Sequence, residues 1–399
     1  MKISTFAGLY ALAGLVAPGQ AESPTPVRKA TVSDKADLGF ATQNGGTTGG
    51  AGGTVTTVST LAQFTAAVAE KNTAPMIVVV QGNISGSAKV RVGSNKSILG
   101  LPGAGFTGIG LQVKKQKNVI IRNIKSASVV AANGDALTID QSTNIWVDHC
   151  EFHSAKGNDK DFYDGLVDVT HASDFVTISH TFFHDHWKTS LVGHSDSNAA
   201  QDLNHLRVTY ANNHWGTTCH MTPSFSPPNP PSLPSPSPTP PGPPLPPKTL
   251  PNTTNPPAPP QLNIGSRAPS IRFGTAHIYN NYYDHVTSAV NTRMGARVVV
   301  ESNAFRSVGD AITSADSSEA GTAVARDNDL GGAASKAPAG AFGIAAVIPY
   351  RYALLGSAAV PGRVPREAGA VLTFESVDGG NATAVPYLRR VRSGRARLW

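Results

Sequence analysis

The sequence contains few cysteines and few charged residues, and each shortage narrows the class of protein. Only Cys150 and Cys219 occur among 399 residues, so at most one disulfide can form and a hydrophobic core must hold the fold. Charged residues make up 15% of the chain, below the roughly one quarter usual in globular proteins, which disfavours coiled coils and long charged helices. Glycine and proline are abundant, with 39 and 30 residues, and this balance indicates a chain of strands and turns.

The formal net charge of +7 does not indicate a nucleic acid or another polyanion as a partner. Six residues near the two chain ends account for all but about one of these charges: Lys2, Arg389, Arg390, Arg392, Arg395 and Arg397. Any affinity for an acidic ligand must therefore come from a local arrangement of residues in the remaining chain.

The first 21 residues have the pattern of a secretory signal peptide: one lysine, an apolar run of roughly 14 residues, and small residues up to Ala21. No later run approaches the ~20 apolar residues that a membrane-spanning helix needs. We therefore expect a secreted, extracellular protein with no membrane partner. Residues 22–38 are polar and are expected to form a leader without regular structure.

Residues 216–262 differ from the rest of the chain, because they contain 19 of the 30 prolines and a single charged residue, Lys248. Proline fixes φ and lacks a backbone donor, so this segment can form neither a helix nor a central strand. A segment of this kind commonly links two domains, and the sequences on its two sides test that interpretation.

Both sides carry the same pattern of short β-branched or apolar runs, which is typical of strands. These runs are KNVIIRNI (117–124), TNIWVDHCEF (143–152), SDFVTISHTFF (173–183), HLRVTYANNHW (205–215), TAHIYNNYYDHV (275–286) and ARVVVESNAF (296–305). Asn281 and Asn303 are 22 residues apart, and Asn213 and Asn281 would share that spacing if the proline segment occupied a single position. The segment is therefore predicted to interrupt one continuous repeat.

A strand repeat with polar turns and no intervening amphipathic helices favours an all-β solenoid, the parallel β-helix. Asparagines at equivalent corners could then form a side-chain hydrogen-bond ladder along the axis, although each could also be an ordinary turn residue. A β-sandwich is compatible with the strand content but would not explain the 22-residue register.

Several motifs resemble the secreted polysaccharide lyases of the pectate lyase and pectin lyase superfamily, and in particular the fungal pectate lyases of polysaccharide lyase family 1. They are NIWVDHCEF, DFYDGLVDVTHASDFVTISHTFFHDHWKTSLVGHSD, HLRVTYANNHW and SRAPSIRFGTAHIYNNYYD. The resemblance implies a single-stranded right-handed parallel β-helix over residues 39–374, interrupted by 216–262. The basic tail, residues 375–399, does not follow the family.

The family chemistry, β-elimination on a uronate polymer, needs a group that removes the proton on C5 and a cation that neutralises the adjacent carboxylate. Asp135, Asp164 and Asp168 precede or begin predicted strands of neighbouring rungs, which stack ~4.8 Å apart. Spacing alone would also fit a surface acidic patch. The resemblance aligns these three residues with the calcium-binding aspartates of the family and so implies Ca²⁺ as the cofactor.

Two arginines in RAPSIR match the Arg-x-Pro-x-x-Arg motif of the family. The resemblance implies that Arg267 is the catalytic base, an unusual role for a guanidinium that normally stays protonated. Arg272 and Lys188 are expected to bind substrate carboxylates. The resemblance also places Trp146, Asp148 and His149 in a motif near the site, where Asp148 and His149 could equally form a pair that supports folding.

The expected function is a monomeric, calcium-dependent pectate lyase that cleaves de-esterified polygalacturonate of the plant cell wall to 4,5-unsaturated products. Two alternatives remain open at this stage. One is a pectin lyase acting on methylated polymer, for which a calcium site would have little purpose. The other is a catalytically impaired wall-binding solenoid, because the proline segment ends only a few residues before Arg267.

Overall fold

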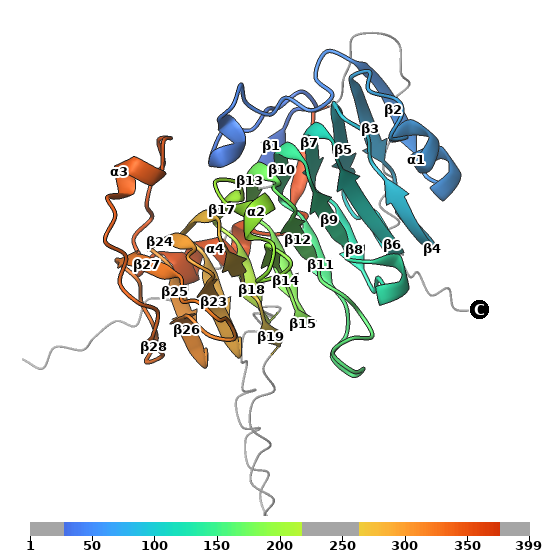
Figure 1. The fold of residues 1–399 in the computed structure, drawn as a ribbon. Coiled ribbons are helices and arrows are strands. Elements are labelled where there is room, and N and C mark those ends of the chain that lie inside the picture. The colour runs from blue at the N-terminus through green and yellow to red at the C-terminus, as the bar shows by residue number, and fades with distance from the viewer. Residues whose placement is uncertain (1–27, 218–262, 376–399) are drawn as a thin grey trace, which may run out of the picture.

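The computed structural model describes residues 28–217 and 263–375, which form a parallel β-helix (Figure 1). The expected signal peptide, nearly all of the proline segment and the basic tail lie outside the described residues. Figure 1 shows the rungs in chain order from α1 (Leu61–Ala67) at one end to β27 (Thr322–Arg326) and β28 (Ala334–Ser335) at the other.

One long side of the solenoid is a sheet of ten parallel strands. Its strands, in order, are β2 (Thr54–Val58), β3 (Met76–Val80), β5 (Lys96–Gly100), β7 (Lys117–Arg122), β10 (Thr143–Asp148), β13 (Asp174–Ser179), β17 (Arg207–Ala211), β21 (Thr275–Tyr279), β24 (Arg297–Glu301) and β27. The β-branched and apolar runs recognised in the sequence are these strands.

The remaining sides belong to a fifteen-stranded sheet in which two rows of strands meet at β6 (Gly105–Lys114), with β4 (Asn83–Arg91) also paired to it. The β9 row comprises β9 (Leu137–Asp140), β12 (Val167–Thr170), β16 (Leu191–Val192), β20 (Ser270–Arg272), β23 (Ser288–Arg293), β26 (Asp310–Thr313) and β28. The β8 row comprises β8 (Lys125–Ala127), β11 (Glu151–His153), β14 (Phe182–His184), β18 (His214–Gly216), β22 (Tyr282–Asp284) and β25 (Ala304–Arg306).

The other elements are short and lie around the solenoid. Two small parallel sheets pair β1 (Arg28–Ala30) with β29 (Leu372–Phe374) and β15 (His186–Lys188) with β19 (Ile264–Ser266). The remaining helices are α2 (Ala199–Asp202), α3 (Ile344–Val347), α4 (Val360–Glu367) and the 3-10 turns η1 (Phe40–Thr42) and η2 (Ala131–Asn133). In the described part of the chain, every helix is too short or too polar to cross a membrane.

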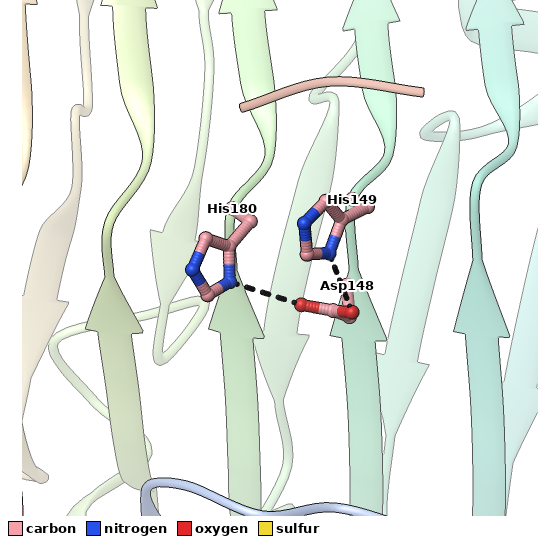
Figure 2. A group of neighbouring side chains, drawn as sticks. All are labelled: Asp148, His149 and His180. Carbon is pink, nitrogen blue, oxygen red and sulfur yellow. Dashed lines mark hydrogen bonds and ion pairs between the residues drawn. The ribbon is translucent and has the colours of Figure 1, made fainter. Parts of the chain in front are cut away.

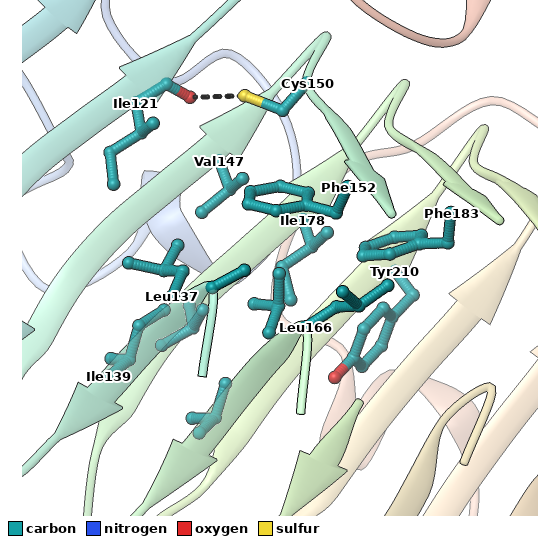
Figure 3. Packing of buried hydrophobic residues seen from close by; sticks show 14 of the residues in the cluster. Ile121, Leu137, Ile139, Val147, Cys150, Phe152, Leu166, Ile178, Phe183 and Tyr210 are labelled. Atoms are coloured by element: carbon teal, nitrogen blue, oxygen red, sulfur yellow. Dashed lines mark hydrogen bonds between the residues drawn. The ribbon is translucent and has the colours of Figure 1, made fainter. Parts of the chain in front are cut away.

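A continuous apolar core fills the inside of the coil, because alternate residues of each strand point inward (Figure 3). Phe152 and Phe183 stack inside it with ring centroids 5.7 Å apart, and Phe183 stacks on Trp215 at 4.2 Å. Cys150 is free and fully buried among these residues, and burial raises the pKa of its thiol to about 12. Such stacking gives every rung the same cross-section.

The asparagine ladder predicted from the spacing is present. Asn213 N–H donates to Asn281 Oδ1 (2.9 Å), and Asn281 N–H donates to Asn303 Oδ1 (2.8 Å). The two chain ends that flank the proline-rich segment also meet: Thr217 Oγ1 donates to Asp284 Oδ2 (2.5 Å), and Asn263 N–H donates to the carbonyl of the next residue, His285 (2.7 Å). The rungs on the two sides of residues 218–262 are therefore adjacent.

The expected leader, residues 22–38, differs from the structure from residue 28 onward. Residues 28–30 form β1, and Asp34 Oδ2 bonds Arg122 Nη1 of β7 at 3.0 Å. Ala36 is buried against Ile120 and Trp146 on the outer face of the ten-stranded sheet. The described part of the leader thus packs on the solenoid. Its polar composition did not predict these few contacts, because they depend on individual residues.

Candidate active site

The predicted site residues lie on four consecutive rungs of the β9 row. Asp135, Asp164, Lys188 and Arg267 lie in the segments that lead into β9, β12, β16 and β20, whereas Asp168 lies in β12 and Arg272 in β20. Backbone hydrogen bonds fix this register: Ala136 N–H to Gly165 O (3.1 Å), Leu166 N–H to Thr189 O (3.0 Å) and Ser190 N–H to Arg267 O (2.7 Å). The structure therefore stacks the neighbourhoods of Asp135, Asp164, Lys188 and Arg267 in that order along the solenoid.

Asp135 and Asp168 converge on Gly165, which lies between them. A Cβ at Gly165 would lie 2.6 Å from Asp168 Oδ1 and 2.8 Å from Asp135 Oδ1, so only glycine fits between the two carboxylates. Gly165 N–H also donates to Asp135 Oδ1 (2.9 Å). Thr138 Oγ1 donates to Asp135 Oδ2 (2.7 Å), and Leu191 N–H donates to Asp168 Oδ1 (3.0 Å). These donors orient both carboxylates.

Asp164 is the most exposed of the three aspartates, with a side chain 48% exposed. Its backbone is held by His186, whose Nε2–H donates to the Asp164 carbonyl (2.7 Å), while Nδ1 lies 2.5 Å from Ser154 Oγ. Burial lowers the pKa of His186 to about 4, so this ring is neutral at pH 7 and keeps that tautomer. His186 thus fixes the loop that presents Asp164.

The three carboxylates repel one another. Burial and the charge of Asp164 raise the pKa of Asp135 above its usual value. Burial and the charge of Asp135 raise the pKa of Asp168 well above its usual range, although Arg267 opposes this shift and Asp164 adds to it. Excess negative charge is therefore concentrated at this point of the β9 row.

Two cationic side chains lie on the next rungs. Lys188 Nζ lies 2.8 Å from Asp161 Oδ1 and 3.5 Å from Asp164 Oδ1. Lys188 pairs with Ser266 in the β15–β19 ladder, so the neighbouring residue, Arg267, follows directly on the adjacent rung. Arg267 has φ of 60°, a left-handed conformation unusual for a non-glycine residue, and its side chain is partly exposed.

Arg272 differs from the sequence expectation in what it contacts. Its side chain is buried, its Nε donates to Asp196 Oδ1, and its Nη1 donates to the Gly193 carbonyl at 2.9 Å. Arg293, on the next strand of the β9 row, also reaches Asp196 Oδ1 at 3.5 Å. Arg272 is therefore already paired with a carboxylate of its own chain, unlike Arg267.

The donor set fits a hard divalent cation. Three carboxylates on two adjacent rungs supply oxygen ligands, which Ca²⁺ prefers. Burial and the neighbouring carboxylates raise the pKa values of Asp135 and Asp168, and a bound cation would favour the charged forms of both groups. The arrangement could hold an acidic ligand between the cation and the adjacent Lys188 and Arg267.

Sequence reasoning did not assign three residues that shape this site: Gly165, His186 and Asp196. Gly165 lies inside the DGLVD motif, and its position between two aspartates was the available signal. The sequence around His186 does not indicate its role, and the structure shows His186 bonded to the Asp164 backbone carbonyl. Asp196 lies far from Arg272 in sequence, and no local pattern links the two.

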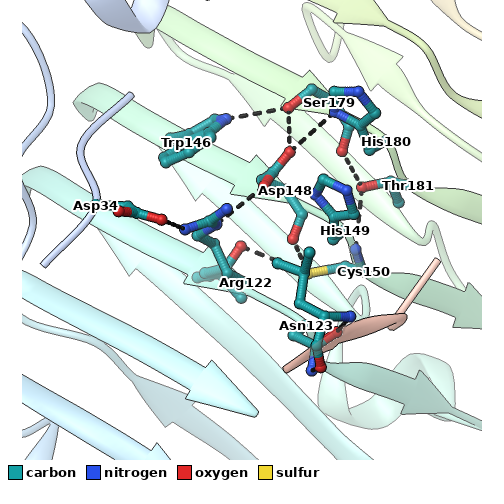
Figure 4. A network of polar contacts seen from close by, with 12 residues as sticks. Asp34, Arg122, Asn123, Trp146, Asp148, His149, Cys150, Ser179, His180 and Thr181 are labelled. Carbon is teal, nitrogen blue, oxygen red and sulfur yellow. Dashed lines mark hydrogen bonds and ion pairs between the residues drawn. The ribbon is translucent and has the colours of Figure 1, made fainter. Parts of the chain in front are cut away.

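Asp148 and His149 lie in a different part of the solenoid, at the end of β10 in the ten-stranded sheet (Figure 2). Asp148 is 2% exposed and accepts bonds from Arg122 Nε (2.9 Å) and Ser179 Oγ (2.7 Å), with His149 Nδ1 at 2.7 Å and His180 Nδ1 at 3.2 Å (Figure 4). Its partners all belong to this cluster, so its role is separate from the aspartates of the β9 row.

Comparison with known proteins agrees with this geometry. The family model for pectate lyase matches residues 10–225 and 262–371. Pectate lyase B of Colletotrichum gloeosporioides is 46% identical over 349 residues, which cover 87% of this chain and 89% of that protein. Pectate lyase A of Aspergillus niger is 44% identical over 378 residues, covering 93% and 100%.

Solved structures show the same fold. A Bacillus pectate lyase in complex with trigalacturonate is 28% identical and superposes with a TM-score of 0.65, covering 84% of this chain and 99% of that one. The match to the family model spans most of the sequence on both sides of the proline-rich segment. The chain therefore belongs to the pectate lyase family and is a polysaccharide lyase.

Proposed function

We propose that this pectate lyase is secreted, depends on Ca²⁺, and cleaves de-esterified polygalacturonate by β-elimination. The observation that carries the proposal is the convergence of Asp135, Asp164 and Asp168 on two adjacent rungs, with Lys188 and Arg267 stacked on the next two. The complex of the Bacillus relative with trigalacturonate, a fragment of such a polymer, supports the choice of substrate. The apolar start of the sequence supports secretion.

The three aspartates would hold the calcium ion, and bound there it would neutralise a uronate carboxylate and so acidify the adjacent C5 proton. Lys188, which lies between Asp164 and the Arg267 rung, would bind a second uronate carboxylate. The exposed Asp164 side chain can adjust to the ion, whereas the buried Asp135 and Asp168 are already oriented by backbone and threonine donors.

Arg267 would remove the C5 proton, while the C5–H electrons form the C4–C5 double bond and the C4–O4 bond breaks; the leaving O4 keeps that bond's electron pair and takes a proton from solvent. Arg267 follows Ser266, which pairs with Lys188, and its side chain is partly exposed, so substrate can reach it. Arg272, through its bonds to Asp196 and to the Gly193 carbonyl, would hold the turn that follows β16, and we retain it as a residue that would bind a substrate carboxylate.

A pectin lyase is the weaker alternative. Methyl-esterified polymer carries no uronate charge, and a cluster of three aspartates, two of them with raised pKa values, would have no purpose for it. The relatives from Colletotrichum gloeosporioides and Aspergillus niger are also named pectate lyases. Comparing the two polymers as substrates distinguishes these alternatives directly.

The test of this function is formation of the unsaturated product from polygalacturonate, followed by ultraviolet absorbance. We expect activity to disappear with a chelator and to return with Ca²⁺ but not with Zn²⁺. Arg267→Lys should lower kcat at least ~100-fold with KM nearly unchanged, because it keeps the charge but changes geometry and proton affinity. Arg297→Lys, an exposed arginine of β24, is the matched control. Full activity after chelation would refute the proposal.

A catalytically impaired solenoid is tested by deleting residues 218–262. Thr217 bonds Asp284, the last residue of β22, and Asn263 bonds the next residue, His285. Because these two partners are adjacent, the ends can be joined with little strain. We expect the deletion variant to keep its circular dichroism spectrum and to retain or raise kcat. An inactive parent chain that becomes active on deletion would support impairment by this segment.

A further inference from the structure

The β8 row carries a second cluster of metal-binding residue types, on the outer face of the solenoid. Glu151 and His153 alternate with the buried Phe152 on β11, so both point outward. His184 lies opposite His153 in the register of β11 and β14. One possible ligand atom from each of these three residues lies within 4.8 Å of the others.

The hydrogen bonds around the two histidines select the tautomers that a metal ion needs. His184 Nδ1–H donates to Asp185 Oδ2 at 2.7 Å, and His153 Nδ1–H donates to the Ser154 carbonyl at 3.4 Å. Since a carbonyl can only accept, the Nε2 atom of His153 carries the lone pair. Metal-binding histidines typically donate their other ring nitrogen to a carboxylate or carbonyl in this way.

The second ring nitrogen of His184 has no hydrogen-bond partner although the residue is only 6% exposed. This Nε2 atom faces Glu151 Oε1 at 3.6 Å, which is too long for a hydrogen bond but leaves space for an ion that both atoms could contact. The two imidazole rings stack with centroids 4.5 Å apart and an interplanar angle of 13°. A buried, unpartnered nitrogen therefore points into the cluster.

Glu151 is held so that one oxygen remains available. Lys125 Nζ of the preceding rung bonds Glu151 Oε2 at 2.7 Å, which leaves Oε1 directed toward the histidines. The Glu151 side chain is 19% exposed, so solvent can reach the cluster. Two imidazoles and one carboxylate form an open three-ligand set for Zn²⁺ or a similar transition-metal dication, whereas Ca²⁺ takes oxygen ligands.

We propose that Glu151, His153 and His184 form a binding site for a transition-metal dication such as Zn²⁺, separate from the three aspartates of the β9 row. The ion would join two neighbouring rungs at the point where the loops begin that lead to Asp164 and Lys188. Its role would be structural, because the cluster lies on the β8 row and the proposed catalytic groups lie along the β9 row. The proposal does not depend on the reaction that the enzyme catalyses.

A competing explanation is a simple ion pair in which His184 is protonated. Burial opposes the charged ring, but Asp185 and Glu151 raise the pKa of His184, and Lys125 and His184 help to hold the pKa of Glu151 at about 2. In that case a proton would occupy His184 Nε2, and this atom could not bind Zn²⁺. The two explanations differ in whether added Zn²⁺ binds at neutral pH.

The test is isothermal titration of the chelator-treated, tag-free full chain with Zn²⁺, in buffer that contains Ca²⁺ to fill the other candidate site. We expect one Zn²⁺ per chain and a higher melting temperature with zinc. Glu151→Gln and His184→Gln should each weaken Zn²⁺ binding at least ~10-fold. His194→Gln is the matched control, because His171 and His194 also stack across neighbouring rungs, at 4.0 Å.

Three results would overturn the proposal. They are no stoichiometric Zn²⁺ binding by the parent chain, equal affinity in the parent and Glu151→Gln chains, and loss of binding in the His194→Gln control alone. If His184→Gln fails to fold by circular dichroism, Glu151→Gln and His153→Gln decide the question, because both side chains are partly exposed. Kinetic activity on polygalacturonate is not the readout, so failure here leaves the proposed lyase function untouched.

Discussion

Two buried aspartates of this protein, Asp148 and Asp168, have similar exposure and opposite electrostatics. Burial alone would raise the pKa of Asp148, but hydrogen bonds from His149 and His180 and the charge of Arg122 hold it well below its usual range. Burial and the charges of Asp135 and Asp164 raise the pKa of Asp168 well above its usual range. The partners of Asp148 within the protein outweigh the effect of its burial, whereas Arg267 does not outweigh the burial and the neighbouring carboxylates of Asp168.

This difference distinguishes the carboxylate of the Asp148 cluster from the carboxylate that we propose as a calcium ligand. Arg122 bonds both Asp148 and Asp34, so the Asp148 cluster also fastens the N-terminal segment to the ten-stranded sheet (Figure 4). Nearby, Asn123 exchanges two hydrogen bonds with the backbone of Leu372 at 2.8 and 3.0 Å and so anchors the C-terminal segment. The aspartates of the β9 row fasten no such segment, and their proximity is unfavourable until a cation binds.

The largest expected effect is on the folding of the Asp148 cluster. Asp148→Asn leaves Arg122 and its buried surroundings without their carboxylate, so it should lower the free energy of unfolding by about 3–5 kcal/mol. Asp310→Asn, at an exposed pair with Lys336, is the control and should cost less than ~1 kcal/mol. Urea unfolding followed by circular dichroism measures both. Equal losses would show that Asp148 has no special structural role.

The next effect concerns catalysis, for which Asp168 is expected to matter more than Asp148. Asp168→Asn should lower kcat/KM on polygalacturonate at least ~100-fold at a fixed calcium concentration, which is about 2.7 kcal/mol. Asp148→Asn should keep the kcat of the parent in the fraction that remains folded. Rates divided by the concentration of folded protein test this. A kcat loss confined to Asp148→Asn would mean that Asp148, and not Asp168, takes part in catalysis.

Calcium should stabilise the folded protein through the β9 row only. At a free concentration ten times its dissociation constant, Ca²⁺ should raise the free energy of unfolding by about 1.4 kcal/mol in the parent chain. Asp148→Asn should keep this increment, whereas Asp168→Asn should lose it. Thermal unfolding with and without Ca²⁺ gives the three increments, and an increment retained in Asp168→Asn would place the ion elsewhere.

The smallest expected effect is the pH dependence of the calcium-free protein. Ionising Asp168 destabilises the fold, and this penalty is absent below the usual carboxyl pKa of 3.8, grows as the pH rises, and is complete above the raised pKa. Asp168→Asn should therefore gain on the order of 1 kcal/mol over the parent at pH 8 and nothing near pH 4. A gain that does not change between these pH values would not come from this carboxylate.

The sequence predicted the fold because a parallel β-helix repeats the same local pattern on every rung. The asparagine spacing placed Asn213 next to Asn281 across the proline-rich segment, and the structure bonds them. The stacking of Asp135, Asp164, Lys188 and Arg267 followed from the same register together with the family motifs. Local periodicity is thus sufficient to align residues on successive rungs.

The side-chain partners could not be predicted in this way, because they depend on turn conformations rather than on the repeat. Arg272 was expected to bind substrate, and the structure pairs it with Asp196 from a turn far away in sequence. Asp148 was associated with the site through its motif, but its strand belongs to the other sheet. The packing of residues 28–38 rests on individual contacts, such as Asp34 with Arg122, that composition does not reveal.

The most direct test of the distinction between the two aspartates is the melting temperature of the parent, Asp148→Asn and Asp168→Asn chains at pH 8 in calcium-free buffer. The two substitutions are chemically identical and both sites are buried, with 2% and 7% exposure. We predict opposite signs: Asp148→Asn melts well below the parent, and Asp168→Asn melts at or above it. A lower melting temperature for both variants would contradict the conclusion that the positive charge near Asp168 does not offset its burial and its two neighbouring carboxylates.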